Sequence, residues 1–205
     1  MAQMTFRNPK TGRFVTSFEK LRLTAKGVDH SFDWYMRKIR ELIGANMTGD
    51  KALRSDLGTL ESYLEIGSMY LYAYDPKFKK TLPYYDIFPL VIPIDYTNKG
   101  FYGLNLHYVP YMVRTKILGS LLDYTDGEPS STTKMQISWE LLKGLSTIKY
   151  MQPCIKQYLN THVKTRFMKI APTEWKAAIF LPVDNFQKAT KQKVFEDSRR
   201  MYGSN

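Results

Sequence analysis

Apolar residues recur at helical spacing in several segments of the chain. Residues 32–42 carry them at steps of three, four and three; Asp29 or Ser31 can cap the first turn, and Gly44 can end the helix. We therefore predict a helix there. The same spacing predicts further helices over residues 51–64, 111–122, 135–150, 153–163 and 172–180, with partial helicity over 184–202.

Between these helices the pattern changes to the period of two that strands show. Residues 69–74 are rich in strand formers and place tyrosines on one side. The apolar run over 87–94 contains two prolines, which cannot donate to a ladder, so we expect this strand at a sheet edge or with bulges. A turn over 95–100 leads to a returning strand over 101–108. These segments predict an α+β fold, with a small curved antiparallel sheet (an SH3-like half-barrel) flanked by helices.

The hydrophobic pattern also divides the chain into three parts. Residues 1–28 have sparse apolar side chains around a turn-forming Asn-Pro-Lys-Thr-Gly stretch, which indicates a basic N-terminal arm. Residues 29–185 form the predicted α+β core domain, and residues 186–205 form a basic C-terminal tail. We expect such arms to become ordered on a neighbouring molecule.

The charge of the chain is strongly positive and unevenly placed. Its 205 residues include 30 Lys and Arg against 19 Asp and Glu, for a formal net charge of +11. The excess lies at the two ends, which suits phosphate backbones or an acidic protein partner. The residues predicted to contact nucleic acid or a partner are Arg7, Arg13, Lys191, Lys193, Arg199 and Arg200.

Hydropathy and cysteine content narrow the class of protein. No apolar run reaches the roughly 18–20 residues of a membrane span, so we expect no membrane partner. The first residues lack the apolar stretch of a secretory signal. A single cysteine, Cys154, permits no internal disulfide and indicates a reducing compartment.

Residues with catalytic chemistry are few and scattered. The three histidines, His30, His107 and His162, lie far apart, and no glycine-rich phosphate loop, nucleophile elbow or zinc-protease motif occurs. Cys154 and His162 are eight residues apart on a predicted helix, too far for a nucleophile and its base. The sequence therefore predicts no catalytic residue, no cofactor and no metal, in a protein that is not an enzyme.

Three aspartates keep one enzymatic alternative open. Asp75, Asp86 and Asp95 flank the predicted strands, where nucleases often cluster acids around Mg²⁺. Each also stands in a turn context, and turn capping explains all three more simply.

Polar and aromatic side chains near the same strands allow two interpretations. Asn105 and His107 alternate with leucines, and they can bind a ligand or satisfy neighbouring loop backbone. The tyrosines of the middle segment can stack bases, or form an aromatic core or a protein interface. Because the middle of the chain is about neutral, an aromatic core or interface is favoured.

Several linked stretches carry a family resemblance over about residues 67–200; they are residues 74–77, 82–86, 88–91, 103–108, 158–163 and 174–182. They resemble a family of small virion-associated proteins of T4-like and other contractile-tailed bacteriophages, for which labels such as DNA-end protector and baseplate protein are used. The resemblance implies a phage protein but assigns no functional residue.

Charge, arms and resemblance together lead to three hypotheses. The first is a non-enzymatic structural protein of the phage particle, assembled in the host cytoplasm and packed against other virion proteins in the tail, baseplate or head–tail junction. The second is a DNA-binding virion protein that caps or protects the ends of the double-stranded genome, with affinity that falls steeply with salt. The third is a metal-dependent nuclease that uses the three aspartates.

Overall fold

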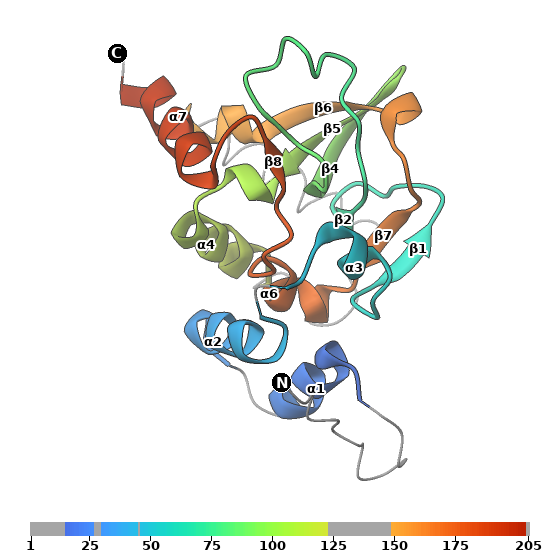
Figure 1. Cartoon of the computed structure of the whole chain (residues 1–205), viewed down its shortest axis with the longest axis vertical. Coiled ribbons are helices and arrows are strands. Elements are labelled where there is room, and N and C mark those ends of the chain that lie inside the picture. The colour runs from blue at the N-terminus through green and yellow to red at the C-terminus, as the bar shows by residue number, and fades with distance from the viewer. Residues whose placement is uncertain (1–14, 27–29, 45, 123–148, 204–205) are drawn as a thin grey trace.

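The computed structural model describes residues 15–26, 30–44, 46–122 and 149–203 (Figure 1). The helices are α1 (Ser17–Ala25), α2 (Phe32–Leu42), α3 (Gly49–Leu53), α4 (Tyr111–Leu122), α6 (Trp175–Ala178) and α7 (Lys191–Gly203). The strands are β1 (Thr59–Glu61), β2 (Met69–Leu71), β3 (Tyr85–Asp86), β4 (Leu90–Thr97), β5 (Gly100–Asn105), β6 (Ile155–Leu159), β7 (Phe167–Ile170) and β8 (Phe186–Gln187). Four 3-10 turns lie at Leu106–Tyr108, Lys149–Cys154, Asn160–His162 and Pro172–Glu174.

Six strands form one antiparallel sheet in the order β1-β7-β2-β4-β5-β6, and β3 pairs with β8 in a separate ribbon. Helices α4 and α7 lie at one side of the sheet, and α1 and α2 lie below it in Figure 1. The predicted α+β class is therefore confirmed. The sheet is open, since β1 and β6 are its two edges, and the SH3-like detail stays a prediction.

The proline-containing strand β4 lies inside the sheet, between β2 and β5. Of the two expectations for it, the edge position is wrong and the bulge is confirmed. The pairing of β4 with β5 shifts register between Pro93 and Asp95. The bulge leaves Ile94 without a partner on β5, directly after Pro93, which has no N–H to donate and stays opposite Gly103.

Alternating side chains of the strands build two separate apolar clusters, one on each face of the sheet. On β2, Met69 and Leu71 join the large core against the helices. Tyr70 and the following Tyr72 point to the other face, into a cluster that contains Phe101 of β5. Tyr70 and Tyr72 are both 0% exposed, so they belong to an aromatic core and do not present their rings to a ligand.

The sheet is strongly curved around this aromatic cluster. The ring centroids of Phe101 on β5 and Phe167 on β7 are 6.2 Å apart, although β2 and β4 lie between their strands. Three strand spacings in a flat sheet would separate these positions by about 14 Å. Tyr72 fills the concave side, with ring centroids 5.7 Å from Tyr158 and 5.1 Å from Phe167.

The predicted helices were confirmed in some segments and wrong in others. Helix α2 follows its predicted cap, because the Ser31 hydroxyl accepts the Trp34 N–H at 3.3 Å. Residues 54–64 are not helical: α3 ends at Leu53, and strand β1 follows. Residues 155–159 form strand β6, since they pair with strand β5 over five positions. Of the helix predicted over 135–150, residues 135–148 lie outside the described residues, and the last two begin a 3-10 turn.

Parts of the predicted arm and tail pack on the core. Phe18 and Leu21 of α1 are 2% and 1% exposed, so the sparse apolar residues of this segment do find a core. Arg22 lies 2.6 Å from Glu174 and 2.8 Å from Asp56. Val194 of α7 is fully buried. The division into arm, core domain and tail remains a prediction, with these contacts joining its parts. None of the helices in the described ranges is long and apolar enough to cross a membrane.

Gly100 occupies a position where no side chain fits. A Cβ there would collide with the carbonyl oxygen of Tyr158 on the neighbouring strand β6. We expect Gly100→Ala to lower the free energy of unfolding by about 1–3 kcal/mol, because overpacking forces backbone apart. Gly119→Ala in helix α4 is the control, since nothing lies within 4 Å of its added Cβ; it should stabilise by about 0.5–1 kcal/mol. Urea unfolding measures both, and equal effects would contradict the packing argument.

Candidate nucleic-acid site: a polar centre and a lysine-lined aromatic pocket

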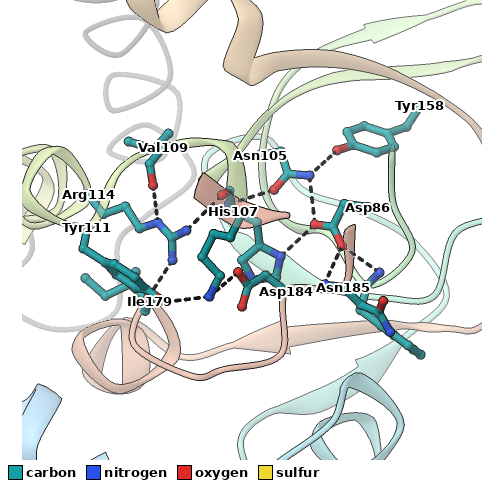
Figure 2. A network of polar contacts seen from close by, with 12 residues as sticks. Asp86, Asn105, His107, Val109, Tyr111, Arg114, Tyr158, Ile179, Asp184 and Asn185 are labelled. Carbon is teal, nitrogen blue, oxygen red and sulfur yellow. Dashed lines mark hydrogen bonds and ion pairs between the residues drawn. The ribbon is translucent and has the colours of Figure 1, made fainter. Parts of the chain in front are cut away.

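Asp86 is the centre of a buried polar network (Figure 2). Its Oδ2 lies 2.7 Å from Nδ1 of His107, and both side chains are 1% exposed. Its Oδ1 accepts the backbone N–H of Phe88 at 3.1 Å and of Asn185 at 3.4 Å. The carboxylate thus ties strand β3 both to the 3-10 turn after β5 and to the segment before β8.

Asn105 extends the network toward β6. Its Nδ2 donates to Asp86 at 3.3 Å and to the Tyr158 hydroxyl at 3.0 Å, and its Oδ1 accepts the His107 N–H at 2.9 Å. Of the two interpretations of Asn105 and His107, the structure supports the structural one, because these contacts join them to protein groups. Burial by itself raises the pKa of Asp86, but the His107 ring and the hydrogen bonds from its donors outweigh that effect and hold the pKa below its ordinary value.

Arg114 of α4 anchors a second part of the same region. It is 1% exposed, and its guanidinium donates to the carbonyls of Val109 at 2.6 Å, Ile179 at 3.0 Å and His107 at 3.0 Å (Figure 2). Burial lowers its pKa. The guanidinium therefore fixes α4 against the turn after β5 and the end of α6.

An open pocket lies beside Asp86 and Asn105, between the loop over residues 76–85 and strands β5 and β6. Its volume is about 390 Å³. Asp86, Asn105 and Tyr158 reach its wall from the polar network, and three lysines line it. The aromatic lining residues are Tyr74, Phe78, Tyr84, Tyr85, Tyr108 and Tyr158, and the lysines are Lys77, Lys99 and Lys156.

Lys156 is the most enclosed cation of the pocket. Its Nζ lies 4.2 Å from the ring centroid of Tyr108, and the residue is half-buried. Burial lowers its pKa. Within the described parts of the chain it has no ion pair with a carboxylate, in contrast to Lys79, which pairs with Asp75 at 2.8 Å. Lys156 is thus a desolvated positive charge that an anion entering the pocket would stabilise.

Lys188 holds the loop that forms the outer wall of the pocket. Its Nζ donates to the carbonyls of Lys79 at 2.6 Å, Lys80 at 2.9 Å and Leu82 at 3.0 Å. Lys188 has a φ of 69°, a left-handed conformation that is uncommon outside glycine. This conformation, at the end of β8, accompanies the approach of the side chain to the loop.

Of the six basic residues predicted from sequence, the structure describes four, and all four lie on helix α7. Arg7 and Arg13 lie outside the described residues. The ammonium of Lys191 is already bound by side chains of the same chain, since its Nζ lies 2.5 Å from the buried Asp184 carboxylate and 2.9 Å from the Tyr111 hydroxyl. Lys193 pairs with Asp197 on the surface of α7 at 2.7 Å. The others, Arg199 and Arg200, are exposed on α7.

The three aspartates of the nuclease hypothesis have different surroundings in the structure. Asp86 is buried and bonded to protein donors, Asp75 pairs with Lys79, and the exposed Asp95 accepts the Tyr96 N–H. Over the described ranges, no group of three or more metal-ligating side chains is brought together. The geometry therefore does not assemble these aspartates into the cluster that the hypothesis requires.

Sequence reasoning missed the lysines of the pocket. Lys156 lies in a segment that was assigned to a helix, which hid its relation to Tyr158. In strand β6 these two residues are two positions apart and so face the same side. The sequence of residues 155–159, Ile-Lys-Gln-Tyr-Leu, does not alternate between apolar and polar positions, so it gave no local signal of the strand.

The comparisons with known proteins point to one family. Neither the curated proteins nor the solved structures gave a match to the chain. A family model described as phage T4 terminal DNA protecting protein matches residues 28–202. This match includes the polar network, the pocket and most of α7. The chain therefore belongs to the phage T4 terminal DNA protecting protein family.

Proposed function

We propose that this protein binds the ends of linear phage DNA and shields them from nucleases, without catalysing a reaction itself. The observation that carries the proposal is the family match over residues 28–202. It moves the genome-end hypothesis ahead of the purely structural one. We assign the protein to the virion. A position in the tail, baseplate or head–tail junction is compatible with binding to a DNA end.

The charge of the chain supports this proposal physically. A net charge of +11 attracts a polyanion over long distances and raises the association rate. Arg199 and Arg200 are exposed on α7, and the three lysines of the pocket face an open space. These groups supply phosphate contacts on the surface without requiring a metal or a cofactor.

An exonuclease assay tests the proposed function. We expect the full-length chain to protect a linear duplex from an exonuclease that digests inward from DNA ends. Unlabelled linear fragments should compete for this protection at least about tenfold better, per mass of DNA, than closed circular DNA, which has no ends. The difference should exceed the nonspecific electrostatic binding that both DNAs share.

Two outcomes would contradict the proposal. Equal competition by linear and circular DNA would mean that the protein binds duplex without regard to ends, and a structural role in the particle would then be favoured. Degradation of the duplex by the protein alone with Mg²⁺ or Mn²⁺ would revive the nuclease hypothesis.

A further inference from the structure

We propose that the pocket beside Asp86 binds the terminal nucleotide of a DNA strand, with its base among the pocket's aromatic rings and its phosphate beside Lys156. This inference rests on the proposed function and names the part of the DNA that the site recognises. Such a pocket would give the protein a preference for DNA ends in addition to a general affinity for duplex DNA.

The size of the pocket fits one nucleotide. Its volume of about 390 Å³ lies in the lower part of the roughly 300–1,000 Å³ range of small-ligand sites. Its lining combines apolar ring surface with a few polar groups, as such sites do. An internal base is stacked on both sides, whereas a terminal base has one stacking neighbour, so moving a terminal base into the pocket costs less unstacking energy.

The rings of the pocket provide stacking surfaces. Phe78 is 61% exposed on the outer loop, with the Lys77 Nζ 5.3 Å from its ring centroid. On the inner side the half-buried Tyr84 is the ring available to a base; its centroid lies 6.1 Å from that of the buried Tyr108, whose face is covered by Lys156. Bases stack on aromatic side chains without regard to sequence, which suits a protein that must hold any genome end.

The cations of the pocket fit a phosphate. Lys156 lies over the Tyr108 ring, half-buried and with no ion-pair partner among the described residues, so a phosphate beside it would replace lost hydration. Lys77 and Lys99 add positive charge to the same lining. Charge-assisted hydrogen bonds from ammonium to phosphate are among the stronger contacts a protein makes.

The floor of the pocket is prearranged. The Asp86 carboxylate accepts donors on both oxygens and is 1% exposed, so its charge is already compensated by the protein. The same network fixes Asn105 and Tyr158 beside the pocket, and Lys188 fixes the outer loop through three carbonyls. Because these contacts already fix the walls of the pocket, binding of a nucleotide would order few further side chains, and the entropic cost of binding is therefore low.

Binding of short duplexes to three single variants tests the inference. Lys156→Met keeps the buried aliphatic stem and removes the charge, and Phe78→Ala removes an exposed ring, so both variants should fold. Lys51→Met, on α3 and outside the pocket lining, is the matched charge control. The probes are a duplex with one open end and one hairpin-closed end, with and without a 5′-phosphate, and a duplex closed by hairpins at both ends.

We expect Lys156→Met and Phe78→Ala each to weaken binding to the open-ended duplex by about 5- to 150-fold. Binding to the doubly closed duplex should change no more than in Lys51→Met. If the 5′ nucleotide enters the pocket, removing the 5′-phosphate should weaken binding by the wild-type protein and change binding by Lys156→Met little. If Lys156→Met weakens binding but removal of the 5′-phosphate has no effect on the wild-type protein, the 3′ nucleotide is the one that enters.

The results separate this inference from the proposed function. An intact preference for open ends in both pocket variants overturns the pocket and leaves end protection standing. If the wild-type protein shows no preference for open ends, the proposed function fails. Titration of the protein with a deoxynucleoside monophosphate then tests whether the pocket binds a nucleotide. Binding that is lost in Lys156→Met upholds a nucleotide pocket, and no binding overturns it.

Discussion

The affinity of the full-length chain for duplex DNA should fall about a thousandfold between roughly 50 and 200 mM salt. Each phosphate that a Lys or Arg neutralises releases counterions, so the slope of log affinity against log salt counts the contacts. About six contacts give a loss of this size. Fluorescence anisotropy on a labelled duplex measures it directly.

The exposed arginines of α7 should account for a defined part of that slope. Replacing Arg199 and Arg200 together with Gln should make the slope shallower by about two, one for each lost phosphate contact. Lys51→Met on α3 serves as the charge control. Weak binding at both salt concentrations would mean that the positive charge of the chain faces protein neighbours in the particle.

Asp86→Asn should lower the free energy of unfolding at neutral pH by about 3–5 kcal/mol. The carboxylate accepts the Phe88 N–H and lies 2.7 Å from His107, and the side chains of Asp86 and His107 are both 1% exposed. An amide at this position presents an NH₂ group toward existing donors and leaves His107 without its anionic partner. Urea unfolding of variant and wild type gives the difference.

The same substitution should change the pH dependence of stability. The pKa of Asp86 is held below its ordinary value in the folded protein, so its ionised form stabilises the fold above the unfolded pKa of about 3.9. That stability is lost as pH falls through the lower folded value. The gap between wild type and Asp86→Asn should therefore narrow below about pH 4. Asp95→Asn, at an exposed turn, should change stability by about 0.5 kcal/mol or less at neutral pH; an equal loss there would contradict the role of burial.

Local patterns predicted those elements whose causes are local. Helix α2 has its cap and its apolar stripe within one segment, and the bulge in β4 follows from the chemistry of proline. Residues 155–159 were misassigned to a helix because the strand there is specified by pairing with β5, more than 50 residues earlier in the chain. Phe18 was placed outside the core because its partners come from distant segments.

The candidate site was predictable only in part for the same reason. Asp86, Asn105 and His107 were each noticed in the sequence, but their meeting depends on strand β3 pairing with β8 near the other end of the chain. The sequence did not single out the pocket lysines. What distinguishes a lysine there is its burial and its lack of an ion-pair partner among the described residues. Neither property can be read from neighbours in sequence.

Cys154 has a consequence for the redox behaviour of the protein. The thiol is 1% exposed, and burial raises its pKa to about 12. Thiolate is the form that oxidises and exchanges with disulfides, and it is almost absent from such a group at neutral pH. In the proposed virion location, where a particle leaves a reducing cell for an oxidising medium, the one sulfhydryl of this chain would stay unreactive.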